Sequence, residues 1–580
     1  MEDYRLKTSI IILTYNQLNY TIQCIESIRQ YTTPDTYEII IVDNNSTDET
    51  RHWLSQQSDI ITILNDSNLG FPKGCNQGME VATGDYILLL NNDTVVTKNW
   101  LNNLLYCINS DERFGAVSCI TNNCSYAQTI PVTYNNLHEM HAFAASHNVS
   151  DQSKWEQRLK LIGFCYLIKR SVVDEIGLLD ERFTPGNYED DDYSLRIRIA
   201  GYELVLCKDT FIHHYGSVSF REDSSYSKLM KENAKKFEEK WGFNPIYSQR
   251  IRFDIINMMD SYTEAPLNVL EVGCACGGTL MNIKHRYPNS NLYGIELDEA
   301  ASSVASIIAD VRNYDVERGV MKYDDNFFDY IILADVLEHL YDPWKVLKNL
   351  KRYLKTDGKI LVSIPNLMHY TVINGLLEGS FTYTDAGILD RTHLRFFTLQ
   401  ELKKMILQSG YYKLDIAAKT LPNKNKGTTD RLSGIVSPAV MEQFNVYQYL
   451  VSAKKHDLEE TFEYIMDHTE ETQAIVNRVS AYTADEVIQS VLLSVNENQA
   501  ELLNTIGVSH FSVGSYEKVL PFFENAFYLD NNNDEILYNI SYFLCFVGES
   551  SNASQFIDRL KEVNEKSYNQ LLDVIKDFVQ

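Results

Sequence analysis

The chain has 580 residues, more than one hydrophobic core usually spans, so we expect three or four domains. Its 44% hydrophobic and 23% charged residues are typical of an ordinary globular protein. The formal net charge of -27 argues against non-specific nucleic-acid binding and against a broadly basic, membrane-facing surface.

The N-terminus and the cysteines indicate a cytoplasmic protein. Residues 1–4 are acidic and lead into one short apolar run, so we predict no signal peptide. No stretch approaches the roughly 18 apolar residues of a membrane span, so any membrane association would be peripheral, at the inner face. The ten cysteines form no disulfide framework. Cys274 and Cys276 lie in a Gly-rich segment, where small residues serve the backbone rather than a metal.

The first third of the chain alternates apolar runs with an amphipathic helix. Residues 8–13 and 38–43 are typical of buried parallel strands, and the helix between them places Ile22, Ile25 and Ile28 on one face. Residues 86–90 continue the pattern. We therefore predict an α/β domain over residues 1–250, with its site at the carboxyl ends of the strands.

Acidic residues follow these strands. Asp93 ends one strand within Asn91-Asn92-Asp93, Asp43 ends another, and residues 189–192 are four acids ahead of a helix. A nucleotide-sugar transferase needs carboxylates to hold Mg²⁺ or Mn²⁺ against the leaving diphosphate, and a base for the acceptor hydroxyl. The alternative for the four acids is a solvated helix cap, because the helix dipole stabilises negative charge there.

This segment, about residues 7–245, resembles a family 2 glycosyltransferase of the GT-A fold. The first carboxylate of the family's Asp-x-Asp motif is replaced here by Asn91. The matching segments are residues 12–16, 42–48, 68–71, 73–76, 84–93, 189–192, Arg196, residues 201–202 and residues 213–217.

The resemblance implies roles for the matching residues. Asp93 would be the metal carboxylate, and His214, in preference to His213, would complete the metal site; paired histidines after a strand also occur as plain packing residues. Asp190 would be the general base, and transfer would invert configuration in a single displacement. The alternatives for the base are Glu189 and Asp192. The residues expected to hold the nucleotide-sugar donor are Thr14, Tyr15, Asp43, Lys73, Asn76 and Asn92.

A second β-α-β series begins at Leu267. Strands are predicted at residues 268–272, 291–296, 329–334 and 359–364, which indicates a Rossmann-like domain over residues 251–420. Residues 421–430 are typical of a polar linker.

A Gly-rich loop follows the first strand of this series. Glu271-x-Gly273-x-Ala275-x-Gly277 would let the backbone approach a ligand closely. Glu296 ends the next strand 19 residues past Gly277 (296 − 277), about the spacing of an acid that binds ribose hydroxyls. The pair predicts a nucleoside cofactor.

Residues 265–418 resemble a class I S-adenosylmethionine-dependent methyltransferase, through residues 328–340, 354–361 and 364–366. The resemblance implies S-adenosylmethionine as cofactor. His339 and His393 are the candidates for a base toward an acceptor hydroxyl, with local structural roles as the alternative. The residues expected around the cofactor are Glu271, Gly273, Gly277, Glu296, Asp315 and Asp335.

From about residue 432 the pattern is helical, and we predict an all-α domain over residues 421–580. Gly514 and Gly548 are 34 residues apart (548 − 514), the period of tetratricopeptide repeats. The alternative is an irregular helical bundle. Such a tail would dock a protein partner, dimerise, or present a polypeptide acceptor.

Together these patterns predict a multidomain α/β enzyme with two activities. It would transfer a sugar to a glycan or lipid-linked glycan acceptor, and methylate the product or a related sugar, in bacterial surface polysaccharide synthesis. The first alternative is a protein or peptide glycosyltransferase whose tail selects the polypeptide. The second is a scaffold with one inactive domain.

Overall fold

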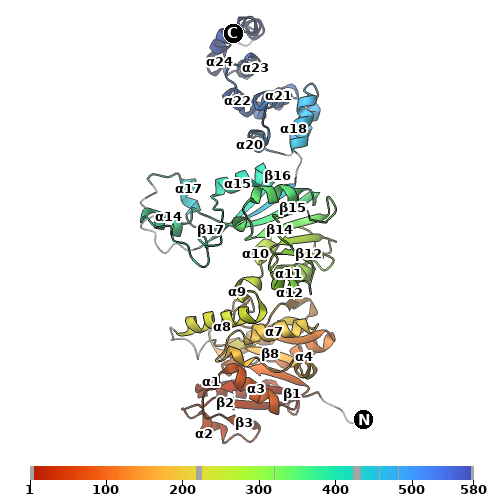
Figure 1. Cartoon of the computed structure of the whole chain (residues 1–580), viewed down its shortest axis with the longest axis vertical. Helices are drawn as coiled ribbons and strands as arrows, with labels where there is room; N and C mark the ends of the chain where they lie inside the picture. The colour runs from red at the N-terminus through yellow and green to blue at the C-terminus, as the bar shows by residue number, and fades with distance from the viewer. Residues whose placement is uncertain are drawn as a thin grey trace. The chain divides into compact units, whose positions relative to one another are not determined.

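The computed structural model describes residues 6–216, 225–318, 321–421, 432, 434–455, 458–480 and 482–576 (Figure 1). The chain divides into two compact units, Met1–Leu267 with Gly273–Asp315, and Asn268–Val272 with Val316–Gln580. Apart from Leu421, the predicted linker at residues 421–430 lies outside the described residues, and so does Ser217.

The first unit contains an eight-stranded sheet of order β3-β2-β1-β4-β8-β6-β9-β7. β3, β2, β1 and β4 are parallel, whereas β8 runs antiparallel to β4 and β6. The three strands predicted from the sequence are confirmed as β1, β2 and β4. The strands are β1 (Thr8–Thr14), β2 (Tyr37–Asp43), β3 (Ile60–Leu64), β4 (Tyr86–Leu90), β6 (Phe114–Ile120), β7 (Trp155–Arg158), β8 (Cys165–Lys169) and β9 (Glu203–Phe211).

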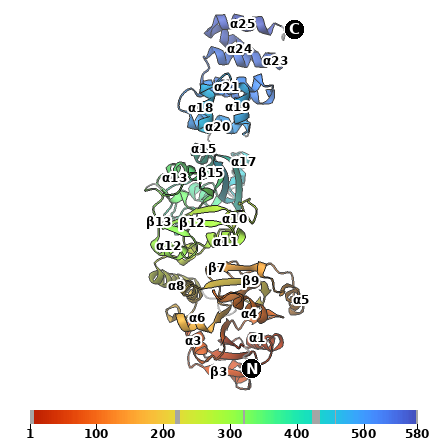
Figure 2. The same cartoon turned by 90° about the vertical axis from the view of Figure 1, so that its right-hand side faces the viewer.

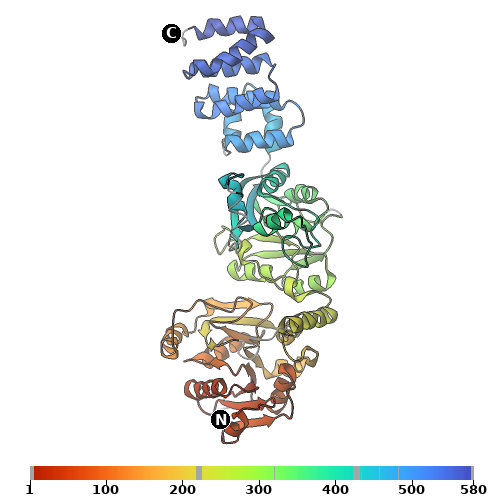
Figure 3. The same cartoon turned by 90° about the vertical axis from the view of Figure 1, so that its left-hand side faces the viewer.

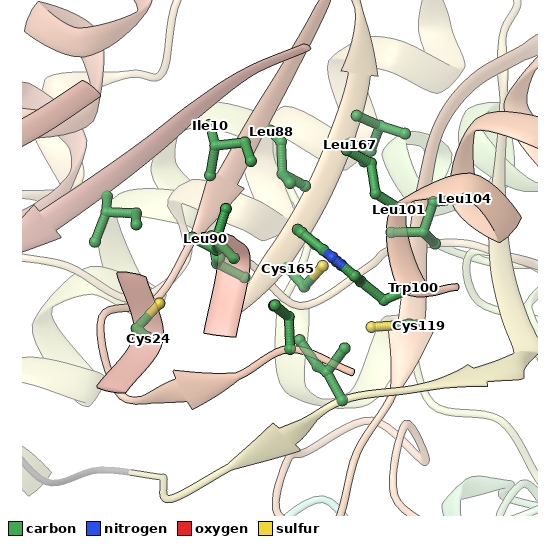
Figure 4. Packing of buried hydrophobic residues seen from close by; sticks show 14 of the residues in the cluster. Ile10, Cys24, Leu88, Leu90, Trp100, Leu101, Leu104, Cys119, Cys165 and Leu167 are labelled. Atoms are coloured by element: carbon green, nitrogen blue, oxygen red, sulfur yellow. The ribbon is translucent and has the colours of Figure 1, made fainter. Parts of the chain in front are cut away.

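The sheet is covered on both faces. Because successive strand residues point to opposite faces, Ile10 and Leu88 pack with Trp100 on one side, and Ile11 and Ile87 belong to a separate cluster on the other. Figure 4 shows the Trp100 side. The helices of this region are α1 (Leu18–Tyr31), α2 (Thr50–Leu54), α3 (Phe71–Val81), α4 (Trp100–Ser110), α5 (Leu137–His147), α6 (Arg170–Ile176), α7 (Glu189–Ile199), α8 (Ser225–Trp241), α9 (Pro245–Ser248) and α10 (Phe253–Ile256).

A small two-stranded sheet lies beyond the end of β4. It pairs β5 (Thr94–Val95) with β10 (His213–His214) in antiparallel register, so that His214 is opposite Thr94 and His213 is opposite Val95. The amide of Tyr215 also donates to the carbonyl of Asp93 at 3.0 Å. Residues more than a hundred positions apart are thereby brought together next to Asp93.

A second sheet has seven strands in the order β13-β12-β11-β14-β15-β17-β16. The four strands predicted from residue 268 onward are confirmed. The strands are β11 (Asn268–Val272), β12 (Asn291–Glu296), β13 (Asp310–Asn313), β14 (Phe328–Ala334), β15 (Leu354–Pro365), β16 (Tyr411–Thr420) and β17 (Val446–Lys455). The associated helices, several of them visible in Figure 2, are α11 (Gly278–Arg286), α12 (Glu299–Ala305), α13 (Pro343–Lys351), α14 (Tyr370–Leu377) and α15 (Leu399–Gln408).

β17 corrects one expectation. The sequence predicts helix from about residue 432, but Val446–Lys455 is a strand that pairs antiparallel with both β15 and β16. Its sequence, VYQYLVSAKK, is rich in β-branched and aromatic residues, and Val451 is fully buried. The prediction of an entirely helical region after residue 432 is therefore wrong for this segment.

The rest of the C-terminal region is helical, as predicted and as the blue part of Figure 3 shows. Gly514 and Gly548 follow the ends of α21 and α23 with positive φ angles of 84° and 85°, a conformation that favours glycine. The first helix of the pair α21–α22 and the first helix of the pair α23–α24 therefore end in the same way. The tetratricopeptide assignment stays a prediction. The helices are α17 (Pro438–Gln443), α18 (Leu458–Asp467), α19 (Thr472–Val479), α20 (Ala484–Ser494), α21 (Gln499–Ser512), α22 (Val519–Leu529), α23 (Asp534–Phe546), α24 (Ser550–Val563) and α25 (Glu565–Ile575).

Within the described residues, every helix is too short or too polar to cross a membrane.

Candidate active sites

A pocket of about 1000 Å³ opens in the first unit, where β4, β5 and β10 meet the start of α7. Asp93, His214, Glu189 and Asp190 all line it, so the predicted metal residues and the predicted base share one cavity. Tyr15 and Asn92 also belong to the lining, together with Asn44, Asn68, Asn91, Tyr126, Lys160, Tyr188, Asp191 and Arg250.

Asp93 and His214 form a pair in this pocket. His214 Nε2 lies 3.2 Å from Asp93 Oδ1, and His214 Nδ1 lies 2.8 Å from the carbonyl oxygen of Asn123. A neutral imidazole that donates its Nδ1 proton to that carbonyl presents the Nε2 lone pair toward Asp93. A carboxylate oxygen and an imidazole nitrogen at this separation suit a divalent cation.

His213 lies elsewhere. Its Nδ1 is 2.7 Å from the Tyr134 hydroxyl, and burial lowers its pKa to about 4. Because successive strand residues point to opposite faces, His213 and His214 point to different sides of β10. The ring of His213 lies among aromatic rings that include Tyr134 and Tyr215. Of the two histidines, therefore, His214 is the one that lines the pocket.

Asn91 and Asn92 occupy the rest of the motif. The Asn91 amide is 3.4 Å from His214 Nε2, and the Asn92 amide donates to the hydroxyl of Thr21 at 3.1 Å and to that of Thr14 at 3.4 Å. The position of the family's first carboxylate is thus taken by an amide that contacts His214, the predicted metal ligand.

The acids at the start of α7 differ in their surroundings. Asp190 accepts hydrogen bonds from the amides of Gly163 and Asp191, both at 3.0 Å. Burial, and then the charge of Asp191, raises the pKa of Asp190 to about 7. Burial, and then Asp190, also raises the pKa of Glu189 well above its usual range. Two adjacent acids with raised pKa values fit a proton-transfer site better than a solvated cap.

Asp192 has a structural position. Its carboxylate is fully buried and contacts Arg196 at 3.0 Å, Lys240 at 2.5 Å and the indole nitrogen of Trp241 at 2.8 Å. It does not appear among the residues lining the pocket. The arrangement thus makes Asp192 an anchor between α7 and α8, although it stands in the same acidic run.

Four predicted donor residues lie outside the described pocket lining: Thr14, Asp43, Lys73 and Asn76. Asp43 is fully buried and pairs with Arg51 at 2.6 Å. Asn76 bonds both the carbonyl and the amide of Leu179 at 2.9 Å. These two side chains are placed to support the loops around the pocket. Lys73 lies 4.0 Å from Glu181.

Lys160 is a pocket residue that sequence reasoning missed. It forms an ion pair with Asp191, and its Nζ lies 4.9 Å from the centre of the Tyr126 ring. No motif marks Lys160, because it reaches the pocket from the segment between β7 and β8. Lys160 and Arg250 supply positive charge near the acids.

The Gly-rich loop of residues 273–277 lies in the first unit. Gly273, Ala275 and Gly277 have φ angles of 71°, 48° and 81°, so the loop repeatedly adopts the left-handed conformation. The carboxylate of Glu296 accepts hydrogen bonds from the amides of Ala275 at 2.7 Å and Asp298 at 2.9 Å. The loop and the acid at the end of β12 are therefore joined by a hydrogen bond, and the ribose-binding role of Glu296 stays a prediction.

Cys274 and Cys276 in this loop are buried thiols. A Cβ added at Gly294 would lie 2.6 Å from the sulfur of Cys274, so the thiol fills the space that this glycine leaves. The position of Cys274 is that of a packing residue, in agreement with the prediction from the sequence. Asp315 lies two residues past the end of β13 and is half-buried.

In the second unit, Glu271 is buried on β11 and Asp335 follows β14. The amide of Asp335 donates to the Ser363 hydroxyl at 3.0 Å, and its carboxylate accepts from that hydroxyl at 2.7 Å and from the side chain of Gln448. Gln448 belongs to β17. The strand that the sequence does not predict thus helps to orient a predicted cofactor residue.

The two candidate bases of the second domain lie together. The rings of His339 and His393 meet edge to face with centroids 4.7 Å apart. Partial burial, and then the proximity of His393, lowers the pKa of His339. Glu338 lies beside them, and one ligand atom from each of the three residues falls within 4.8 Å of the others.

Two family models match the chain. Residues 9–177 match the glycosyl transferase family 2 model, and residues 246–416 match a methyltransferase domain model. The chain contains a family 2 glycosyltransferase domain and a methyltransferase domain. The two resemblances seen in the sequence are thereby confirmed.

Curated relatives match about a third of the chain. The O-antigen biosynthesis protein RfbC of Myxococcus xanthus is 26% identical over 233 residues, which are 38% of this chain and 18% of the relative. The low-salt glycan biosynthesis hexosyltransferase Agl10 of Haloferax volcanii is 28% identical over 198 residues, which are 33% of this chain and 62% of the relative. The chain thus spans less than two thirds of the length of these relatives.

Solved structures are similar to part of the chain. A mannosyltransferase of Pyrobaculum calidifontis, in complex with GDP-Man and Mn²⁺, is 19% identical with a TM-score of 0.32, covering 43% of this chain and 68% of that one. A SAM-dependent methyltransferase of Archaeoglobus fulgidus is 20% identical with a TM-score of 0.27, covering 38% of this chain and 99% of that one.

Proposed function

We propose that the glycosyltransferase domain transfers a sugar from a nucleotide-sugar donor to a glycan hydroxyl, with inversion and with help from a divalent cation. The observation that carries this proposal is the single pocket that contains Asp93 and His214 together with Asp190. A metal site for a diphosphate and a base for a hydroxyl are the two requirements of this reaction.

The residues present fit a metal ion. Asp93 and His214 offer an oxygen and a nitrogen 3.2 Å apart, and the Asn123 carbonyl holds the imidazole so that Nε2 faces the carboxylate. These two residues would hold Mn²⁺ or Mg²⁺, which supplies charge stabilisation for a leaving diphosphate. Lys160 and Arg250 add positive charge in the same cavity.

Asp190 would accept the proton of the acceptor hydroxyl. Its pKa of about 7 places the carboxylate near the working pH, where a base is both substantially ionised and a strong acceptor. The amides of Gly163 and Asp191 hold its two oxygens. Glu189 is the alternative base, because it lines the same pocket.

We further propose that the methyltransferase domain uses S-adenosylmethionine to methylate the glycosylated product or a related sugar. Glu296 and the backbone of the Gly-rich loop would bind the ribose of the cofactor. Asp335, which Ser363 and Gln448 hold in the second unit, stays a predicted cofactor residue. Methyl transfer is a direct displacement, so alignment of donor and acceptor contributes most of the rate. The names of RfbC and Agl10 support a setting in glycan biosynthesis.

The test is calorimetric titration of the full chain with UDP, GDP and dTDP, each with and without Mn²⁺. We expect one nucleotide to bind tightly and only with Mn²⁺. The variant Asp93→Asn should bind the nucleotide weakly with or without Mn²⁺, whereas Asp66→Asn, a change at an exposed residue, should behave as wild type. Mn²⁺-independent binding in the wild type would contradict the metal role. A parallel titration with S-adenosylmethionine tests the second domain.

A further inference from the structure

Glu338, His339 and His393 form a cluster of potential metal ligands within the described part of the second unit. Glu338 and His339 lie on the short 3-10 helix Leu337–His339 that follows β14. His393 comes from the loop before α15, more than fifty residues later. The fold therefore brings a carboxylate and two imidazoles to the carboxyl edge of the sheet.

Both imidazoles are held in the same way. His339 Nδ1 lies 3.3 Å from the carbonyl oxygen of Thr392, and His393 Nδ1 lies 3.0 Å from that of Ile388. A backbone carbonyl can only accept, so each Nδ1 carries a proton and each Nε2 is the nitrogen left to bind a metal. Metal-binding histidines are commonly oriented by this kind of contact.

The two segments are also fastened at the backbone. The carbonyl of Glu338 accepts hydrogen bonds from the amides of Leu394 at 2.7 Å and Arg395 at 3.0 Å. The residue that follows His393 is thus bonded directly to the residue that offers the carboxylate. The side chain of Glu338 is 1% exposed, so its carboxylate is held in a buried position.

The surrounding charges favour a cation. Asp335 and Asp390 are close enough to His339 for their charges to act on it. Asp390 is held in place because it accepts hydrogen bonds from the amide and hydroxyl of Thr392. The nearby guanidinium groups have other partners, since Arg391 pairs with Asp385 and Arg395 donates to the carbonyl of Tyr341.

We propose that Glu338, His339 and His393 bind a divalent transition-metal ion of the Zn²⁺ or Co²⁺ type. Two imidazoles and one carboxylate are a ligand set that such ions accept, and three protein ligands leave positions for water or a substrate oxygen. Ligands of one such ion are bonded at about 2.0–2.2 Å, so small side-chain rotations would bring these atoms into the coordination sphere.

The site has a second consequence, which rests on the proposed methyl transfer. An ion with an open position would bind an oxygen of the acceptor and make its hydroxyl easier to deprotonate. Under this reading His339 and His393 are ligands, and neither serves as a free base. Metal binding itself does not depend on the activity of either domain.

The experiment measures metal stoichiometry on the full chain. Equilibrium dialysis with Zn²⁺ and visible ligand-field absorption with Co²⁺ are recorded for wild type, His339→Gln/His393→Gln and His468→Gln, an exposed histidine of the same unit. We expect the double variant to bind one equivalent of Zn²⁺ fewer than wild type. It should also lose the visible absorption band of Co²⁺ that is bound to nitrogen ligands. The control should match wild type.

A third variant, Asp93→Asn/His214→Ala, removes the proposed metal site of the glycosyltransferase domain. It should still bind the equivalent of Zn²⁺ that the His339→Gln/His393→Gln variant loses. Each of the two proposed metal sites can therefore be tested even if the other binds no metal. Equal Zn²⁺ stoichiometry in wild type and the His339/His393 variant would overturn the proposal. If the double variant does not fold, His339→Gln alone is used. His339 is the more exposed of the two histidines, so this change is the milder one, and we expect at least a tenfold weaker Zn²⁺ affinity.

Discussion

Adjacent carboxylates in one helical turn have different surroundings in this protein. Asp190 lines the pocket, whereas Asp192 is buried against Arg196 and Lys240. Successive helical residues point about 100° apart, so a run of acids at a helix start must face several environments. The charge run therefore contains both a candidate base and a structural anchor.

Asp190→Asn should abolish most of the sugar transfer and leave donor binding intact. A general base contributes about 10²–10⁴-fold to the rate, so we expect kcat to fall by that factor. In the wild type, the rate should rise with pH through about 7, because only the ionised carboxylate accepts a proton. Steady-state kinetics across pH and calorimetric donor titration measure both effects.

Asp174→Asn, an exposed acid, is the control for this variant. The pKa of Asp190 is higher in the folded protein than in the unfolded chain. The protein therefore loses stability as the pH rises from the unfolded-state pKa of this carboxyl toward about 7, because the buried carboxyl must ionise. At a pH above 7, the Tm of Asp190→Asn should accordingly be equal to or higher than that of wild type. Full transfer activity in this variant would remove Asp190 from the base role.

Asp192→Ala should act on stability. Its removal takes the fully buried carboxylate away from Arg196, while Lys240 keeps its second partner Asp180 at 2.7 Å. Breaking a fully buried pair costs about 3–5 kcal/mol, and we take this as the upper bound for the loss. We expect a clearly lower Tm of the first unit in calorimetry, with residual transfer in the folded fraction. An unchanged Tm together with lost transfer would instead indicate a direct role in the reaction.

At the scale of elements, β17 changes where the methyltransferase fold ends. The family match stops at residue 416, yet β17 lies between β15 and β16 and is bonded to both. Without Val446–Lys455, β16 loses its partner and Gln448 no longer reaches Asp335. The last two strands of this sheet thus depend on a segment that lies beyond the residues matching the family model.

A chain that ends at residue 420 should therefore bind S-adenosylmethionine at least tenfold more weakly than one that ends at residue 457, which keeps β17. We expect the shorter chain also to unfold at lower temperature, because an unpaired strand edge and the apolar residues of β15 become exposed. Thermal unfolding and calorimetric titration compare the two. Equal affinity would show that β17 is dispensable for the cofactor site.

At the scale of the whole molecule, two transferase domains share one chain. Covalent linkage raises the effective concentration of an intermediate at the second site, provided that the intermediate is the second substrate. The proposed order, glycosylation and then methylation, makes this a kinetic prediction that does not require any particular arrangement of the domains.

An equimolar mixture of Asp190→Asn and Glu296→Gln chains should form the doubly modified product more slowly than wild type at low protein concentration. Each variant lacks one proposed activity, so the intermediate must diffuse between chains. The difference should vanish at high protein concentration. Mass spectrometry of the products over time measures both rates, and equal rates at every dilution would mean that the two domains do not act on one product in sequence.

The sequence by itself determined seven of the strands and their order in the chain. Strands such as residues 86–90 and 268–272 were predictable because buried parallel strands are continuous apolar runs, and the Gly-rich loop was predictable because its left-handed residues need small side chains. The acids at strand ends followed from the same local rules. These features depend on residues close together in the chain.

Only the tertiary structure decided which of these residues meet. The pairing of β5 with β10 places His214, and not His213, in the pocket lining. The turn of α7 likewise places Asp190 in that lining and Asp192 against Arg196. Lys160 reaches the pocket without any motif, and β17 joins the second sheet across a long connection. Such contacts depend on strand register and on distant segments packing together, which local periodicity does not encode.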